Sequence, residues 1–275
     1  LVNLVFGPLV NSSYGVGQQV AGVQSSLAST GLQAVRPALI TSAGKGASAA
    51  VRSLILISSR YFFALTALAS IPVIFEAQTL LELWLGADRI ANDLPWVVPL
   101  TRLICAIWMV NSLTSSFSNG IQAHGKLRTF TLVTLLIDGS SLGVAWLLVG
   151  PLGLPPPSIP ASFLGFLVVH AVFQSWYVGR KLDLSPLLWV RESAGPALLS
   201  GAAAFGVGLA VLALMPETLL RVPVTFAATT AALLLVFWRV GVGTPERTAL
   251  SGIIRSGAVK VGLRRGPGTE GVANS

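Results

Sequence analysis

The sequence predicts an all-α protein, a polytopic bundle of transmembrane helices. Only 10% of the 275 residues are charged, whereas a soluble domain carries about 25%. Hydrophobic residues make up 53% of the chain, and its mean hydropathy is +0.76. Apolar stretches of about 20 residues recur along the chain, the length that crosses a hydrocarbon core of about 30 Å. Lipid is therefore the expected solvent for most of the protein.

The apolar stretches predict seven nearly complete spans after a short helical stub. The stub, Leu1–Phe6, is closed by Gly7 and Pro8, which break helices. The first complete span is a long helix from Asn11 to Ile40. The other six lie at about 57–78, 97–121, 130–150, 159–179, 193–215 and 222–240. Because the chain begins inside an apolar segment and without Met, we expect it to be the C-terminal half of a longer protein.

The helix from Asn11 to Ile40 is rich in polar residues for a membrane span. It contains four glutamines and many small residues, which allow helices to approach closely in lipid. The glutamines cannot all face lipid tails, because an amide without a hydrogen-bond partner is costly there. Part of this helix should therefore face a partner or a watery cavity. Asn11, Gln18 and Gln19 are the candidates to contact a substrate in that cavity.

The basic residues follow the pattern that positive-inside insertion produces. If the turn after the first full helix is cytoplasmic, fourteen lysines and arginines lie inside. Two, Arg89 and Arg221, lie in outer loops. One missed or extra span would break this alternation. The C-terminus is therefore predicted to be cytoplasmic, and the basic segment 241–275, rich in Gly, Ser and Thr, is predicted to be a disordered cytoplasmic tail.

Charged residues inside spans are candidates for function because charge is costly in lipid. Asp138 lies near the middle of its span, where two interpretations stay open. It is either a cation or proton coupling site or a buried carboxyl bonded to Ser140, Ser141 or a neighbouring helix. Arg102 lies about one turn inside the outer end of its span. It either binds an anionic substrate in a cavity or reaches the outer headgroups.

Three further residues have more ordinary interpretations. Arg36 lies near the inner end of its helix, so contact with headgroups is favoured over a role in substrate binding. His170 lies in mid-span and is expected to form a hydrogen bond between helices. Glu76 lies near an outer helix end and is expected to mark the interface.

The sequence argues against an enzyme and against nucleic-acid binding. It has no DxD or HExxH motif and no paired carboxylates on one loop, so no catalytic residue, metal ligand or cofactor is predicted. Cys105, the only cysteine, lies in an apolar run and is expected to be a small buried residue. The net charge of +8 comes from short gaps between spans, not from a basic face with interleaved aromatics, so no nucleic-acid partner is predicted.

Residues 1–180 contain a series of segments whose order and spacing are informative. They are Phe6-Gly-Pro-Leu-Val-Asn11, Tyr14-Gly-Val-Gly-Gln-Gln-Val20, Leu32-Gln-Ala-Val-Arg-Pro-Ala-Leu-Ile40, Ser58-Ser-Arg-Tyr-Phe-Phe63, Leu80-Leu-Glu-Leu-Trp-Leu85, Arg102-Leu-Ile104, Ile121-Gln-Ala-His-Gly-Lys126 and Leu152-Gly-Leu-Pro-Pro156. Together they resemble bacterial polysaccharide flippases of the multidrug/oligosaccharidyl-lipid/polysaccharide exporter superfamily, whose fold is MATE-like. The last two spans and the tail are generic.

The resemblance implies two lobes of six helices each, sometimes followed by two extra helices. Residues 1–180 would be the C-terminal lobe, from the end of helix seven to helix twelve, and residues 181–240 the two additional helices. The missing N-terminal lobe of the same protein would be its partner. Two residues depart from the family: a non-basic residue such as Asn is expected where Arg36 stands, and Asp138 is not a family signature.

The resemblance implies that the protein flips an undecaprenyl-pyrophosphate-linked oligosaccharide across the bacterial inner membrane for surface polysaccharide synthesis. The family works by alternating access around a central, often cationic cavity. The implied partners are the lipid-linked oligosaccharide, membrane lipids and a polysaccharide polymerase. Two alternatives stay open. One is a cation-coupled drug or metabolite exporter of the same fold, which requires an acidic cavity. The other is a membrane-embedded glycosyl or acyl transferase, which the missing acidic motifs disfavour.

Overall fold

A computed structural model describes residues 2–123, 125, 127–243 and 246–248. These residues form helices joined by short turns, without a strand. The elements are α1 (Val2–Phe6), α2 (Pro8–Gly44), α3 (Ser48–Leu85), α4 (Ala87–Asn92), α5 (Val97–Ser112), α6 (Ser115–Ala123), α7 (Leu127–Val149), α8 (Ser158–Leu182), α9 (Pro186–Trp189), η1 (Val190–Ala194), α10 (Gly195–Leu214), α11 (Arg221–Val236) and η2 (Phe237–Gly241). The all-α prediction is confirmed for this part of the chain.

Six helical segments of the described chain are long and apolar enough to cross a membrane. They are Ser48–Leu85, Val97–Ala123, Leu127–Val149, Ser158–Leu182, Pro186–Leu214 and Arg221–Gly241. The protein is therefore a polytopic helical membrane protein. Helix α2 has 37 residues but is not apolar enough to be counted with these six, because glutamine, serine and glycine take the place of apolar residues along it. Of the seven predicted spans, six thus qualify by hydropathy and α2 by its length alone.

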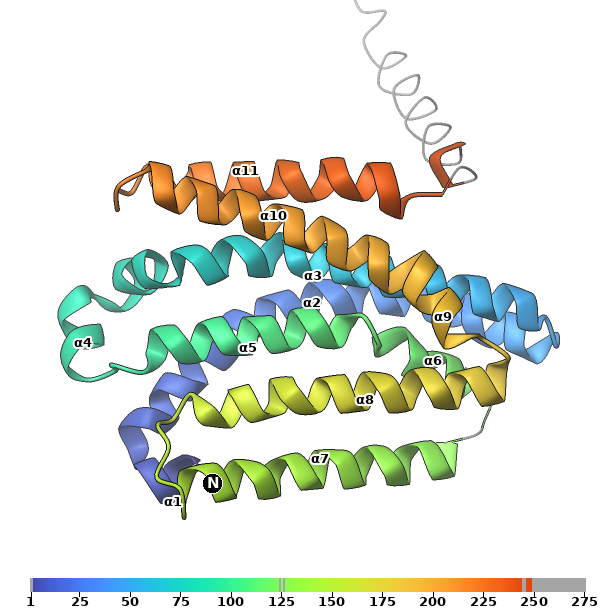
Figure 1. Ribbon diagram of the computed structural model, residues 1–275, viewed down its shortest axis with the longest axis horizontal. Coiled ribbons are helices and arrows are strands. Elements are labelled where there is room, and N and C mark those ends of the chain that lie inside the picture. Colours follow the sequence, from blue (N-terminus) through green and yellow to red (C-terminus); the bar gives the residue numbers. More distant parts are fainter. Residues whose placement is uncertain (1, 124, 126, 244–245, 249–275) are drawn as a thin grey trace, which may run out of the picture.

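The long helices run between the two ends of one bundle (Figure 1). The turns 45–47 and 183–185 lie at one end, which we call the basic end after the arginines and lysines near it. The turns 150–157 and 215–220 lie at the opposite end, together with α4. Helix α2 runs the length of the bundle beside the others, so it takes part in the alternation (Figure 1). The turns thus alternate as predicted, and the cytoplasmic placement of the basic end stays a prediction.

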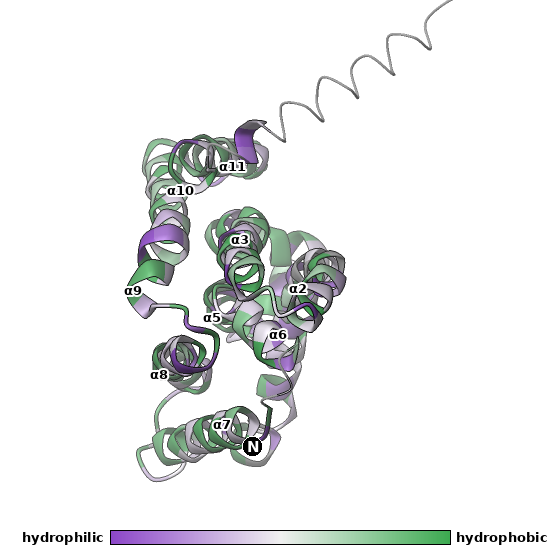
Figure 2. Ribbon diagram, turned by 90° about the vertical axis from the view of Figure 1, so that its right-hand side faces the viewer, coloured by the Kyte–Doolittle hydropathy of each residue, from purple (hydrophilic) through white to green (hydrophobic). Residues whose placement is uncertain are grey.

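Helix α3 lies at the centre of the bundle. It packs against α2, α5 and α6 and also against α10 and α11. In its most apolar stretch 61% of the residues are buried, compared with 17% to 44% in the other five spans. Seen end-on, α10 and α11 lie on one side of the α2–α3–α5 group and α7 and α8 on the other (Figure 2). The outer faces carry exposed leucines, as surfaces in contact with lipid do.

The predicted span at 97–121 is interrupted between α5 and α6. Polar side chains of α3 contact the break. The Ser59 hydroxyl donates to the Leu113 carbonyl and lies 2.9 Å from the Ser116 hydroxyl. The hydroxyls of Thr66 and Ser112 lie 2.8 Å apart. These bonds satisfy polar groups that an interrupted helix exposes inside a membrane.

Two glycines of α10 allow its close approach to α3. A Cβ atom at Gly201 would lie 2.9 Å from the ring of Phe63, and one at Gly208 would lie 2.1 Å from the ring of Phe75. Small residues at such contacts permit van der Waals packing between helices in lipid. The helix pair that follows residue 180 is thus docked on the central helix.

Candidate functional site

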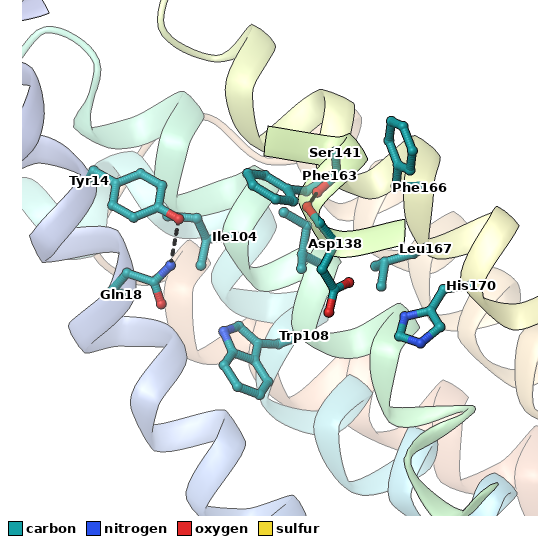
Figure 3. Close-up of a pocket in the computed structure, with 11 residues that line it drawn as sticks. Tyr14, Gln18, Ile104, Trp108, Asp138, Ser141, Phe163, Phe166, Leu167 and His170 are labelled. Carbon is teal, nitrogen blue, oxygen red and sulfur yellow. Dashed lines mark hydrogen bonds between the residues drawn. The ribbon is translucent and has the colours of Figure 1, made fainter. Parts of the chain in front are cut away.

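A pocket lies between α2, α5, α7 and α8, about halfway along α7 and α8 (Figure 3). Its volume is about 220 Å³. The lining residues are Tyr14, Gln18, Ile104, Ile107, Trp108, Asp138, Ser141, Phe163, Phe166, Leu167 and His170. Most of this wall is apolar or aromatic, so a few polar groups determine its chemistry. We call it the Asp138 pocket after the only charged side chain that lines it.

Helix α2 contributes two polar side chains to the pocket. Tyr14 and Gln18 are four residues apart and therefore lie on one face of the helix. The amide nitrogen of Gln18 donates to the Tyr14 hydroxyl at 3.0 Å (Figure 3). This bond orients both groups toward the pocket. Gln18 therefore lines the Asp138 pocket, and its contact with a substrate stays a prediction.

The carboxylate of Asp138 points into the pocket from α7 (Figure 3). None of the described residues donates a hydrogen bond to it. The Ser141 hydroxyl donates instead to the backbone carbonyl of Asp138, at 2.7 Å. The interpretation as a buried carboxyl bonded to Ser140, Ser141 or a neighbouring helix is therefore wrong, because Asp138 is exposed and its carboxylate accepts no hydrogen bond from the described residues. The carboxylate is left free to interact with water, a cation or a proton.

His170 faces Asp138 across the pocket from α8 and interacts with it electrostatically (Figure 3). Its Nε2 atom lies 2.8 Å from the amide nitrogen of Gln174 and 3.4 Å from the Thr134 hydroxyl of α7. The expectation of a histidine that bonds between helices is confirmed by the contact with α7. The pocket thus combines a free carboxylate with an imidazole whose Nε2 already has partners.

The other candidates on α2 lie outside the Asp138 pocket. Asn11 and Gln19 are exposed in the structure. Arg36 is also exposed and lines a separate shallow pocket of about 410 Å³ with Gln33, Pro37, Ile40 and Thr41. That pocket lies toward the basic end, as expected for a residue near the inner headgroups. Roles of these three side chains in substrate binding stay predictions.

Arg102 lies in the first turns of α5 and is exposed. Its Nε donates to the backbone carbonyl of Ile74 in α3, at 2.9 Å. Arg102 does not line the Asp138 pocket. The remaining guanidinium nitrogens are free to meet either a headgroup phosphate or an anionic substrate, so both interpretations of Arg102 stay open.

A buried polar junction joins α2, α3 and α5. Gln24, which is only 1% exposed, donates from its amide nitrogen to the Cys105 sulfur at 3.0 Å. The Ser70 hydroxyl donates to the amide oxygen of Gln24, also at 3.0 Å. Cys105 is buried as expected and is also a hydrogen-bond acceptor. One of the four glutamines therefore serves helix packing.

Glu76 and Arg221, which the sequence places separately near outer helix ends, form a buried pair in the structure. Glu76 is fully buried, and Arg221 is the first residue of α11 with only 6% exposed. The guanidinium donates to both carboxylate oxygens, with bonds of 3.0 and 3.1 Å, and the Thr225 hydroxyl adds a bond of 2.7 Å. Two charges buried together satisfy each other, whereas each alone would have to reach water.

The sequence contains only a weak indication that Glu76 and Arg221 form an ion pair. Glu76 and Arg221 are opposite charges near span ends that the predicted alternation places on the same side of the membrane. Helix α3 also bends at Glu76, whose φ of −98° and ψ of 15° are not helical, one turn after Pro72. The pairing joins positions 145 residues apart, and no local pattern identifies it.

Within the described chain, no group of three His, Cys, Asp or Glu side chains is placed to hold a metal ion. Comparison with known proteins gives no relative: no family model, no curated protein and no solved structure matches the chain. The resemblance to polysaccharide flippases therefore rests on the segments quoted above, and the functional argument rests on the helices and their pockets.

Proposed function

We propose that this protein is a transporter that flips a lipid-linked oligosaccharide across the membrane, with the Asp138 pocket as its cation or proton coupling site. The observation that carries the proposal is the exposed Asp138 carboxylate, which faces a largely apolar pocket among membrane-spanning helices and receives no hydrogen bond from the described residues. Ionisable groups in such positions are costly and commonly serve ion or proton pathways. An Asp with a His beside it is one form of such a proton relay.

The Asp138 pocket is too small to be the binding site of the oligosaccharide. Its volume of about 220 Å³ lies below the roughly 300–1,000 Å³ of pockets that hold drug-sized molecules. It can hold a few water molecules or an ion, because one water occupies about 30 Å³ in the liquid. The oligosaccharide therefore needs another space.

The resemblance implies that this space is shared with an N-terminal lobe. Four candidate side chains are exposed and so remain available to it: Asn11, Gln19, Arg36 and Arg102. Amides can replace water around the sugar hydroxyls, and guanidinium groups can bind the pyrophosphate. Such a cavity lowers the barrier to flipping because the charged head never meets hydrocarbon.

A cation-coupled exporter of drugs or metabolites is the second candidate. The aromatic residues Trp108, Phe163 and Phe166 line the same pocket as Asp138. A carboxylate with aromatic neighbours attracts organic cations through charge and cation–π contacts. The acidic character that such an exporter requires is therefore present in the Asp138 pocket.

The test replaces Asp138 with Asn in the complete protein and uses Asp88→Asn as the matched control. Asp88 lies on the short helix α4, outside the spans, so its substitution removes the same charge from an exposed position. Two activities are measured. One is export of surface polysaccharide in complemented cells, and the other is flipping of a labelled lipid-linked oligosaccharide between the leaflets of proteoliposomes. We expect Asp138→Asn to abolish ion-driven transport and Asp88→Asn to retain it.

The same variants separate the two candidates. If Asp138→Asn leaves polysaccharide export intact and abolishes efflux of cationic dyes, the protein is an exporter and the flippase proposal fails. If both activities persist at normal membrane abundance, Asp138 has no coupling role.

A companion pair tests Arg102 as a substrate contact. Arg102→Lys keeps the charge and the ability to reach headgroups, but it loses the planar fork that binds phosphate bidentately. We expect reduced export from both Arg102→Lys and Arg102→Ala. Normal export by both variants would remove Arg102 from the substrate site.

A further inference from the structure

A second polar site lies at the basic end of the bundle, where α3, η1 and η2 meet. Its volume is about 740 Å³. It is lined by Ser53, Leu56, Ile57, Arg60, Arg191, Glu192, Pro196, Val240, Val242, Gly243 and Glu246. It shares no residue with the Asp138 pocket, and the proposed transport function does not use it.

Arg60 provides the positive charge at the centre of this site. Its side chain is only 12% exposed, although it belongs to a charged residue. One terminal nitrogen donates to the Glu192 carbonyl at 3.0 Å, and the other donates to the Glu246 carboxylate. Its Nε is buried and has no hydrogen-bond partner among the described residues. A buried guanidinium with an unused N–H can still donate a hydrogen bond to a further anion.

The carboxylate of Glu246 shows how an anion is held here. In addition to Arg60, it accepts a hydrogen bond from the Tyr61 hydroxyl at 3.3 Å and one from the Gly243 backbone N–H at 3.1 Å. A guanidinium, a phenol and a backbone amide are also suitable donors for the oxygens of a phosphate. Glu246 therefore occupies an anion site that is built from three separate donors.

An apolar groove of about 470 Å³ adjoins this anion site between α3 and the end of α11. It is lined by Tyr61, Ala64, Leu65, Leu68, Leu234, Leu235, Phe237, Trp238 and Val242, none of which is charged. Tyr61 connects the two spaces, because it lines the groove while its hydroxyl contacts Glu246. Val242 lines both. A single ligand can therefore occupy both spaces only if it has an anionic head and an apolar chain.

The edge of the groove adds a further positive charge. Arg247 donates to the backbone carbonyls of Trp238 and Arg239, at 2.7 and 2.9 Å, and its guanidinium lies 6.0 Å from the centre of the Trp238 ring. Basic pockets between helix ends are typical positions for phosphate-bearing lipid headgroups. The lining of the anion site carries two arginines, Arg60 and Arg191, and two glutamates, Glu192 and Glu246. Once Glu246 is displaced, the arginines are in excess, so the remaining charge and the apolar groove fit the same kind of molecule.

We infer that this composite site binds an anionic glycerophospholipid. The phosphate takes the position of the Glu246 carboxylate between Arg60, Tyr61 and Gly243, and an acyl chain lies in the groove along α3 and α11. A phosphate diester carries one negative charge, as the carboxylate does, so the exchange leaves the charge of the site unchanged. Glu246 is then an internal competitor that fills the site when the lipid is absent.

The experiment measures lipid binding to the purified complete protein in detergent by native mass spectrometry and by fluorescence titration. Dioleoyl phosphatidylglycerol is the anionic probe, and dioleoyl phosphatidylcholine and inorganic phosphate are the comparison ligands. Thermal unfolding of each variant is recorded, so that loss of the fold is not counted as loss of binding. We expect the native protein to bind phosphatidylglycerol more tightly than either comparison ligand.

Three variants report on the three parts of the site. Arg60→Gln should weaken phosphatidylglycerol binding at least about tenfold, because charge-assisted hydrogen bonds are lost. Glu246→Gln should strengthen binding, because the competing carboxylate loses its charge. Leu235→Asn places an amide on the wall of the groove and should weaken binding of the lipid without changing binding of inorganic phosphate. Leu235 is 68% exposed, so its replacement does not threaten the fold.

Arg128→Gln is the matched control for charge. Arg128 is an exposed arginine of α7 near the same end of the bundle, and it lines neither the anion site nor the groove. Equal losses in Arg60→Gln and Arg128→Gln would mean that the basic end attracts anionic lipid without a built site. Weaker binding by Glu246→Gln would show that Glu246 supports the site instead of competing for it. Either result overturns the inference, as does binding of inorganic phosphate as tight as that of the lipid.

Discussion

The buried pair of Glu76 and Arg221 gives the sharpest test of how this bundle is stabilised. Replacing Glu76 with Gln keeps the shape of the side chain and removes its charge. Arg221, whose side chain is 7% exposed, then keeps its own charge without the counterion that holds it. Breaking a buried pair from one side costs about 3–5 kcal/mol, because the remaining charge is left uncompensated. We therefore expect the free energy of unfolding to fall by about that amount.

Two structural details refine this magnitude. Glu217 lies 3.9 Å from the same guanidinium, but its side chain is 77% exposed, so it can compensate for only a small part of the lost charge. The Thr225 hydroxyl donates to the Glu76 carboxylate at 2.7 Å. A hydrogen bond to a charged group contributes about 1.5–3 kcal/mol, so Thr225→Val should lower stability by less than Glu76→Gln does.

The measurement is thermal unfolding of the purified protein, followed by the fluorescence of its seven tryptophans. The expected loss for Glu76→Gln corresponds to a fall in Tm on the order of 10 °C. Glu217→Gln is the matched control and should change the unfolding free energy by less than about 1 kcal/mol. The double variant Glu76→Leu/Arg221→Met should recover most of the loss, because apolar residues of similar volume often replace a buried pair without cost.

The role of Glu76 and Arg221 as a stabilising buried pair fails if Glu76→Gln and Glu217→Gln have the same small effect. It also fails if the double variant loses as much stability as the two single variants together. Independent effects of that kind would mean that the two side chains do not act as a pair.

Three further predictions concern topology and packing. Reporter fusions in the turns 45–47 and 150–157 should report the cytoplasm and the periplasm respectively, and one reversed site would refute the span order. At Gly208 even a Cβ would lie 2.1 Å from the Phe75 ring of α3, so Gly208→Leu should lower the unfolding free energy by at least about 1–3 kcal/mol. Gly206→Leu, where an added Cβ would meet nothing within 4 Å, should lower it far less. Gln24→Leu should cost about 1–3 kcal/mol, because it leaves buried polar partners unsatisfied, and an unchanged Tm would contradict this role.

Hydropathy locates the outer spans closely because their sequences change abruptly at the membrane border. The span predicted at 159–179 is found as Ser158–Leu182, and the one at 130–150 as Leu127–Val149. The central helix is less well predicted: the span at 57–78 is found as Ser48–Leu85. The helix extends beyond the apolar stretch at both ends, into segments with charged residues that hydropathy assigns to loops. These ends stay helical because they pack against other helices of the bundle.

The pairing of side chains could not be predicted, because it depends on which helices are neighbours. Asp138, Gln18 and His170 come from three helices, and Glu76 and Arg221 from two others. Sequence reasoning identified Gln18 and Asp138 as separate candidates on the basis of the cost of polar groups in lipid. It had no means of placing them in one pocket, or of telling that Gln24 is part of a packing junction while Gln19 is exposed.

The charged residues of the spans differ in how they are satisfied, and this difference separates structural from functional roles. Glu76 has a guanidinium and a hydroxyl as partners, and Arg102 has a backbone carbonyl of α3. Asp138 is exposed and has no donor among the described residues, so the fold gains no stability from its charge. Asp138→Asn should therefore leave the Tm unchanged or raise it, whereas Glu76→Gln lowers it. If Asp138 is dispensable for stability but required for transport, its role is chemical. A lower Tm of the Asp138→Asn variant would instead show that Asp138 stabilises helix packing.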